Sequence, residues 1–261
     1  MSTGVIQYKT EEEIDLIRIS GQLLAKAHGE VAKLVKEGVT PKQLDQRAEE
    51  FIRDHGGVPS FKGYKNFPFT LCLSVNEAVV HGFATDKPLK SGDIISVDCG
   101  VFMNGYHADS AYTHPIGEVA PEVLALLRET KASLYKGIEK AVSGNRVGDI
   151  SYAIQNHVGP LGYGVVRELV GHGVGAKLHE SPDVPNYGKR GSGPLLQTGL
   201  VIAIEPMVNL GKKDVVQEKD GWTIRTKDRK PSAHFEHTVV VRKEKAEILT
   251  SFEYIEKALQ Q

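Results

Sequence analysis

Five residues of the chain are of types that could together bind metal ions. They are Asp98, Asp109, His172, Glu205 and Glu236, and each lies in an apolar or glycine-rich segment. A carboxylate buried in such a segment needs a compensating positive charge, and these segments hold no matching set of Lys or Arg. Two divalent cations would cancel the four negative charges. The residues therefore predict a hydrolase that uses two metal ions, with Mn, Fe or Co favoured over Zn because the ligands are mostly oxygens.

A hairpin is predicted to bring the first two acids together. Asn104-Gly105 is the strongest two-residue hairpin signal, and a turn there places Asp98 opposite Ala111 and Gly100 opposite Asp109. Asp98 and Asp109 then lie on one face as diagonal neighbours, about 7–8 Å apart at the backbone. That separation suits carboxylates that converge on two metals about 3.5–4 Å apart.

An internal repeat links the first two acids to the last two. Residues 91–98 and 198–205 each run from a hydroxyl residue and a glycine through an apolar strand to a carboxylate six residues after the glycine. A second acid follows each copy, Asp109 in the first and Glu236 in the second. The alternative is chance, since glycine-led apolar strands are common. The coincidence with the acids favours two related α/β halves about a pseudo-twofold axis, with a site between them.

Histidines close to these acids are further candidate ligands. His172 stands in Gly171-His172-Gly173-Val174-Gly175, where glycines would let the backbone approach a bound group closely. On a strand, His234 shares the face of Glu236 and could support it. His237 points away from that face and is expected to pack or form a hydrogen bond there.

The elements that must position these residues follow from local signals. Capping-box spacing at Thr10 and Thr40 predicts helices that end near Gly38 and Gly56. Further helices are expected over 121–142 and 147–158, and residues 181–194 are expected to form a surface loop. Strands are expected near 71–75, 94–101, 106–114, 165–170, 200–206, 214–218, 222–226 and 233–242.

Bulk composition is that of an ordinary globular protein. The chain has 261 residues, 40% hydrophobic and 25% charged, with a net charge of -1. No segment reads as a membrane span or a secretory signal, the charge does not favour nucleic acid, and two cysteines cannot form a disulfide framework. We expect a cytoplasmic monomer with one catalytic domain over 1–261, whose halves cover about 10–118 and 119–255.

The motifs around these residues resemble those of the type I methionine aminopeptidases. The similarity extends from about Glu11 to Glu253. It is carried by Val75-Asn76-Glu77 through His81-Gly82, Val97-Asp98-Cys99-Gly100, Gly105-Tyr106-His107-Ala108-Asp109, Gly171-His172-Gly173-Val174-Gly175, His179-Glu180, Ile204-Glu205-Pro206-Met207 and Phe235-Glu236-His237-Thr238. The resemblance implies an α+β pita-bread fold, with an antiparallel sheet and helices on its outer face. It also implies removal of the initiator methionine from nascent proteins and peptides whose second residue is small.

The resemblance implies roles for individual residues as well. The five residues above match the metal ligands of the family, with Asp109 and Glu236 bridging both ions. Glu205 would accept a proton from the attacking water, His179 would polarise the scissile carbonyl, and His81 would contact the reacting amide. The positions that match the methionine pocket are Tyr64, Phe67, Cys72 and Trp222. Lys65, Phe69 and Leu178 depart from residues common in relatives and leave the shape of the pocket open.

Two other functions compete with this interpretation. Proline-specific peptidases share the fold and ligands but usually carry an extra N-terminal domain, and some relatives are non-catalytic protein-binding modules that have lost ligands. This chain has a short segment before its first helix and keeps all five ligand residues. The substrate of the family also suggests transient contact with the ribosome, without direct binding of nucleic acid or membrane.

Overall fold

The computed structural model describes residues 4–260. The helices are α1 (Glu11–Ala32), α2 (Pro41–Asp54), α3 (Pro121–Ile138), α4 (Val147–Val158) and α5 (Glu253–Ala258), with short 3-10 turns at Tyr64–Asn66 and Gly159–Leu161. The strands are β1 (Val58–Pro59), β2 (Leu71–Val75), β3 (Ala78–Val80), β4 (Ile94–Met103), β5 (Tyr106–Pro115), β6 (Gly164–Val165), β7 (Gly171–Gly173), β8 (Glu180–Val184), β9 (Val201–Ile204), β10 (Met207–Asn209), β11 (Val215–Gln217), β12 (Ile224–Thr226), β13 (Ser232–His234), β14 (Glu236–Val240) and β15 (Glu247–Ile248).

Both predicted capping boxes are confirmed. The Thr10 hydroxyl accepts a hydrogen bond from the Glu13 amide at 3.3 Å, and the Glu13 carboxylate accepts one from the Thr10 amide at 2.8 Å. Thr40 and Gln43 repeat this exchange at the start of α2. The predicted end of the first helix is wrong by several residues. The helix stops at Ala32, and Gly38 instead donates its amide to Leu89 O at 2.8 Å, which turns the chain toward another loop.

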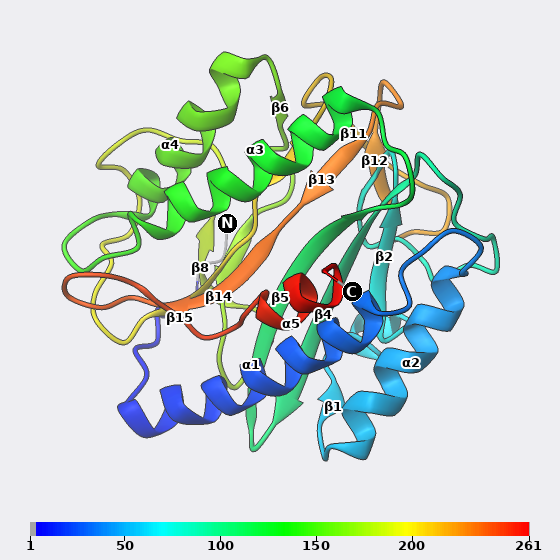
Figure 1. The fold of residues 1–261 in the computed structure, drawn as a ribbon. Helices are drawn as coiled ribbons and strands as arrows, with labels where there is room; N and C mark the ends of the chain where they lie inside the picture. Colours follow the sequence, from blue (N-terminus) through cyan, green and yellow to red (C-terminus); the bar gives the residue numbers. More distant parts are fainter. Residues whose placement is uncertain (1–3, 261) are drawn as a thin grey trace.

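One antiparallel sheet forms the centre of the molecule (Figure 1). Its strands follow the order β1-β4-β5-β14-β9-β7-β8, with β2 also paired to β4 and β15 to β14. The hairpin β4–β5 and the pair β14–β9 meet at the middle, where β5 lies against β14. Two small sheets, β13-β10-β6 and β11-β12-β3, lie beside it. The symmetric order agrees with two related halves that meet at β5 and β14.

The hairpin register is confirmed. Asp98 lies opposite Ala111 and Gly100 lies opposite Asp109, as the Asn104-Gly105 turn predicts. A slip of one residue would have turned one acid to the opposite face of the sheet. The register therefore places both acids on one face.

The repeated glycines perform the same task in both halves. Gly92 and Gly199 adopt φ values of 93° and 88°, a region that favours glycine. The Gly92 amide donates to Ile116 O at 2.9 Å, just past β5, and the Gly199 amide donates to Val241 O at 3.1 Å, just past β14. Each glycine thus turns the chain into the strand that leads to an acid and ties it to its partner strand.

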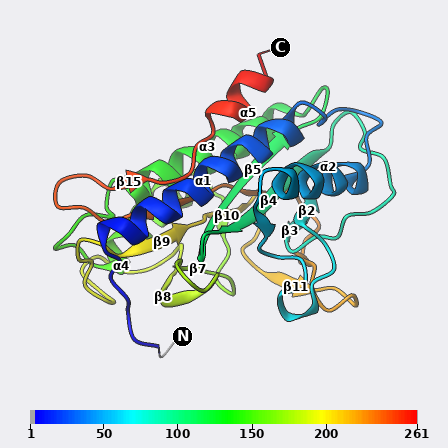
Figure 2. The ribbon, with the colours of Figure 1, turned by 90° about the horizontal axis from the view of Figure 1, so that it is seen from below.

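The helices cover one face of the central sheet, which Figure 2 shows from the side. Ile14, Ile17 and Leu24 of α1 are fully buried in the core of one half, while α3 and α4 pack together in the core of the other. This arrangement agrees with the predicted α+β class. No helix within residues 4–260 combines the length and apolar character needed to cross a bilayer.

Three predicted segments differ from the structure. The strand expected at 165–170 is reduced to β6, and part of the loop expected at 181–194 forms β8, because Glu180–Val184 pairs with β7. The strand expected at 233–242 is interrupted at Phe235. The chain changes sheets there, since β13 pairs with β10 and β14 pairs with β9. In each case pairing with a distant segment decides the outcome.

Two buried histidines stand behind the central strands without enough hydrogen-bond partners. His28 donates from Nε2 to Ser110 O at 2.9 Å, but its Nδ1 and both ring nitrogens of His114 have no partner. Burial lowers the pKa of His28 to about 4 and that of His114 to about 3, from 6.5. Both rings are therefore neutral in the folded protein at neutral pH.

Acid should unfold the protein partly through these rings. Between pH about 6.5 and about 4 the unfolded chain binds more protons than the folded one, so the free energy of unfolding falls as the pH falls. His114→Phe should reduce this dependence by up to about 1.4 kcal/mol per pH unit. Urea unfolding of metal-free protein across this range would measure the slope. The exposed His55→Phe serves as the control, and equal slopes for wild type and His114→Phe would contradict the prediction.

Candidate metal centre and substrate pocket

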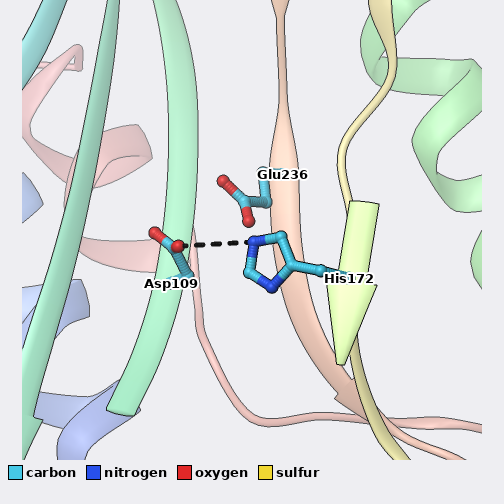
Figure 3. Close-up of side chains that lie close together, drawn as sticks. All are labelled: Asp109, His172 and Glu236. Carbon is cyan, nitrogen blue, oxygen red and sulfur yellow. Dashed lines mark ion pairs between the residues drawn. The ribbon is translucent and has the colours of Figure 1, made fainter. Parts of the chain in front are cut away.

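The five predicted ligand residues converge from separate strands. Asp98 lies on β4, Asp109 on β5, His172 on β7 and Glu236 on β14, while Glu205 directly follows β9. All five line one cavity. Figure 3 shows the side chains of Asp109, His172 and Glu236 pointing toward one another from three strands.

The separations between these side chains leave room for a cation. One ligand atom from each of Asp109, His172 and Glu236 lies within 4.8 Å of the others. His172 Nε2 is 3.9 Å from Asp109 Oδ2 and 3.6 Å from Glu205 Oε1. These distances are too long for hydrogen bonds.

The protein supplies few hydrogen-bond donors to these carboxylates. Asp98 Oδ1, Asp109 Oδ1 and Glu236 Oε1 are buried and accept no hydrogen bond. Burial and repulsion between the acids raise the pKa of Asp98, Glu205 and Glu236 well above the ordinary range, and burial raises the pKa of Asp109 to about 7. Unpartnered buried oxygens with raised pKa values are what a divalent cation would stabilise. The donor set therefore fits hard metal ions.

His172 is prepared to act as a neutral ligand. Its Nδ1 lies 2.9 Å from Gly173 O, and because a carbonyl only accepts, Nδ1 carries the proton. The lone pair is then on Nε2, which faces Asp109 and Glu205. Burial lowers the pKa of this ring and favours its neutral form. A hydrogen bond that fixes the tautomer in this way is typical of metal-binding histidines.

The glycines beside His172 serve packing, which corrects the expectation that they admit a bound group. A side chain at Gly171 would strike Ala203 O of β9, and one at Gly173 would strike Ser181 O of β8. Strand β7 is therefore pressed between its two neighbours. The close fit fixes the strand that carries His172.

Two threonines hold β5 against β13 and β14 around the acids. Direct pairing covers only Glu236 with Ala111 and His237 with Ser110. On one side, the Thr238 hydroxyl accepts from the Asp109 amide at 3.0 Å and donates to Asp109 O at 2.8 Å.

The other side repeats this arrangement. The Thr113 hydroxyl accepts from the His234 amide at 2.9 Å and donates to His234 O at 2.7 Å. Side-chain hydroxyls thus stand where a continuous sheet would have direct backbone hydrogen bonds. The inserted hydroxyls space the strands apart beside the carboxylates.

The two histidines outside the ligand set also border the cavity. His81 has a φ of 58°, uncommon for a non-glycine residue. The next residue, Gly82, has no room for a side chain because Leu73 O of β2 lies against it. His179 stacks against His172 and Tyr64, with ring centroids 4.1 Å and 5.2 Å away. Burial lowers the pKa of His81 to about 4, and burial with nearby positive charges lowers that of His179 to about 3.

The two histidines near Glu236 point to opposite sides, as their alternating strand positions predict. His234 Nε2 lies 3.8 Å from Glu205 Oε2 and 4.0 Å from Glu236 Oε2, behind the acids. His237 turns to the other side, where its Nδ1 is 2.7 Å from the Thr250 hydroxyl and its ring stacks on Phe252.

Apolar and aromatic residues make up much of the rest of the cavity lining. The cavity measures about 210 Å³, and the four predicted pocket residues Tyr64, Phe67, Cys72 and Trp222 all line it. Phe67 and Cys72 are buried, and Phe67 meets Trp222 edge to face at 5.1 Å. Both cysteines of the chain are free thiols.

Sequence reasoning did not assign every lining residue to the pocket. Phe61, Val80, Leu169, Val170 and Met207 also border the cavity. Met207 belongs to the motif Ile204-Glu205-Pro206-Met207, so its closeness to Glu205 in the sequence is a signal that could place it at the site. The others come from loops and short strands whose apolar residues look like ordinary core.

Comparisons with known proteins agree with this site. The profile of metallopeptidase family M24 matches residues 15–243. The methionine aminopeptidase of Clostridium perfringens is 50% identical, over 94% of this chain and 99% of the relative. Methionine aminopeptidase 1 of Bacillus subtilis is 48% identical, over 93% of this chain and 98% of the relative.

Solved structures show the same fold. The methionine aminopeptidase of Thermotoga maritima superposes with a TM-score of 0.93 at 42% identity, covering 95% of this chain and all of that one. The prolidase of Pyrococcus furiosus superposes with a TM-score of 0.77 at 23% identity, and the match covers 94% of this chain and 65% of that one. The fold is the pita-bread fold that these structures share.

Asp109→Asn should abolish tight metal binding, because it removes a charge from the centre of the donor set. Calorimetric titration of the metal-free variant with MnCl₂ should show no strong site. Wild type at a metal concentration of about 100 Kd should gain about 2.7 kcal/mol of stability that the variant does not gain. The exposed Asp86→Asn is the control and should bind like wild type. Unchanged affinity in Asp109→Asn would refute the assignment.

Proposed function

Since the chain belongs to metallopeptidase family M24, we infer that it is a methionine aminopeptidase, an enzyme that removes the N-terminal methionine from peptides and proteins. The high identity to methionine aminopeptidases over nearly the whole chain supports this activity. One structural observation carries the inference furthest: the five ligand-type residues line the same cavity as an apolar cluster that includes Phe67, Cys72 and Trp222. A reactive centre beside a small apolar pocket suits a peptide whose first side chain is apolar and fills that pocket.

The same family membership makes the enzyme metal-dependent. We propose that Asp98, Asp109, His172, Glu205 and Glu236 would hold two divalent ions, and Asp109 and Glu236 would be the residues able to serve both. Mn, Fe or Co suits this oxygen-rich set better than Zn. When bound, two such ions supply a hydroxide nucleophile near neutral pH and positive charge that polarises a carbonyl.

Glu205 is the best placed proton acceptor among the acids. Its side chain is 13% exposed, compared with 5% for Asp109 and 3% for Glu236. Glu205 is therefore the most accessible of these three acids to a water in the cavity. Burial and the charge of Asp109 raise the pKa of Glu205 in the metal-free protein.

His179 and His81 would act on the peptide rather than on a metal. His179 reaches the surface at the rim of the cavity, and its neutral ring can donate a hydrogen bond to the scissile carbonyl. His81 lines the same cavity beside Trp222, at a ring separation of 6.1 Å, and would contact the reacting amide. The strained backbone at His81 points to a functional constraint on its position.

The apolar part of the cavity lining would select methionine. Phe67, Trp222, Tyr64 and Cys72 offer aromatic faces and a small thiol to an unbranched side chain. Contacts between a thioether and aromatic rings favour methionine over aliphatic residues of similar length. The free amine of the substrate would then lie toward the acids, which limits cleavage to the first residue.

Neither alternative function is favoured. The prolidase likeness stands at 23% identity and shows the fold alone. A non-catalytic binding module would have lost ligand residues, whereas all five are present and converge in this chain.

The cellular setting is likewise a proposal. We assign the enzyme to the cytoplasm as a monomer that acts on emerging chains, with transient contact to the ribosome and no direct binding of nucleic acid or membrane. The two free cysteines suit a reducing compartment.

A peptide panel tests the activity. With Mn, Fe or Co, the enzyme should cleave Met-Ala-Ser, because its first residue fits the pocket and its second is small. It should leave Met-Lys-Ser and Ala-Pro-Ser intact. Release of the first residue can be followed by chromatography. Preference for Ala-Pro-Ser would transfer the chain to the proline-specific group, and cleavage of none of the peptides would support the binding-module interpretation.

His179→Ala should lower kcat by about 10²-fold, the usual effect of removing one donor to a developing oxyanion. Metal content should stay at the wild-type value, since His179 is outside the proposed ligand set. Steady-state kinetics on Met-Ala-Ser and metal analysis of the same sample separate these effects. The control is His157→Ala, a surface residue paired with Glu129. A normal kcat in His179→Ala would rule out the proposed role.

A further inference from the structure

The rim of the substrate cavity carries a lysine. Among the residues that line the cavity, only Lys65 and His179 are exposed, while the acids and the apolar residues are buried or half-buried. A peptide whose first residue fills the apolar pocket must leave the cavity past exposed residues. Lys65 therefore stands where the rest of the substrate emerges.

The backbone holds Lys65 in a defined position. Lys65 and Asn66 have φ values of 46° and 69°, two consecutive non-glycine residues in the left-handed region. The turn is closed by a hydrogen bond from the Gly63 amide to Phe67 O at 2.8 Å. Backbone in such a region persists where its surroundings hold it, and it is concentrated at functional sites.

The side chain of Lys65 is also directed by its neighbours. Its Nζ lies 5.3 Å from the centre of the Tyr64 ring, within cation–π distance. The same ring stacks on His179, with ring centroids 5.2 Å apart. Lys65, Tyr64 and His179 thus lie close together in the lining of the cavity.

The ammonium of Lys65 has no carboxylate partner among the described residues. Lys62, three positions earlier, forms an ion pair with Glu49 at 2.6 Å, but none of the ion pairs within residues 4–260 includes Lys65. The four acids that line the cavity would be neutralised by the two divalent ions of the proposed function. An uncompensated positive charge at the exit of the cavity attracts a carboxylate.

We propose that Lys65 is a specificity-determining residue that favours substrates with an acidic third residue. The inference rests on the proposed function. If the second residue must be small, the third is the first that can carry a charge. In an extended peptide the first and third side chains lie on the same side, so a third side chain would follow the methionine toward the wall that Lys65 borders.

Amidated peptides Met-Ala-Xaa-Gly-Gly, with Glu, Gln or Lys as Xaa, test this preference, because the side chain of Xaa is then the only variable charge. Wild type should show kcat/KM values higher by about three- to fivefold for Glu over Gln, the range of an exposed ion pair. Lys65→Met should abolish the difference, Lys65→Glu should reverse the order of the Glu and Lys peptides, and added salt should weaken the preference.

Lys62→Met is the matched control, since it removes a lysine from the same loop that does not line the cavity. Its preference should equal that of wild type. The same preference in Lys65→Met and wild type, or an equal loss in Lys62→Met, would overturn the inference.

Two further comparisons separate recognition of the third side chain from recognition of a terminal carboxylate and from a failure of the proposed function. The tripeptide Met-Ala-Gln, compared as free acid and as amide, shows whether a terminal carboxylate is recognised. A preference confined to that carboxylate would overturn recognition of the side chain. Equal cleavage of the Glu, Gln and Lys peptides would contradict this inference alone. No cleavage of any peptide by the metal-loaded enzyme would contradict the proposed function as well.

Discussion

Burial of four carboxylates around one small space is the constraint on which the rest of the structure depends. In the metal-free protein these acids repel one another and lack hydrogen-bond donors, so their pKa values rise and the cluster opposes folding. Divalent cations reverse the sign of this contribution, because they supply the charge that the chain does not. The core of each half must therefore outweigh the cost of a site that is stable only when loaded.

The architecture around the acids keeps that space open. On either side of the short stretch where β5 pairs with β14, side-chain hydroxyls replace direct backbone hydrogen bonds: Thr238 of β14 bonds to Asp109 of β5, and Thr113 of β5 bonds to His234 of β13. Glycines beside His172 allow β7 to press against its neighbours. The strands are thus spaced apart beside the β5–β14 pairing and packed closely at β7. This arrangement directs five side chains from different strands toward a common point.

The residues that line the cavity differ in burial. Asp98, Asp109, His172 and Glu236 are buried on strands, where packing fixes their positions. Lys65 is exposed on a short turn. An exposed residue contacts few neighbours, so it can vary without disturbing the buried acids. Lys65, one of the departures from common residues, is of this kind, whereas Leu178 is buried in the apolar part of the lining.

Both capping boxes, the hairpin register and the five residues that meet in the candidate metal site were predictable from the sequence, because residue type, turn chemistry and strand alternation are local properties. The short β6, the strand at Glu180–Val184 and the break at Phe235 were not, because each depends on pairing with a distant segment. The packing role of Gly171 and the unpaired state of Lys65 depend in the same way on neighbours remote in the chain. The sequence by itself determined which groups could do the chemistry, whereas the tertiary structure alone decided where they meet and what surrounds them, since contacts between distant residues are absent from any local pattern.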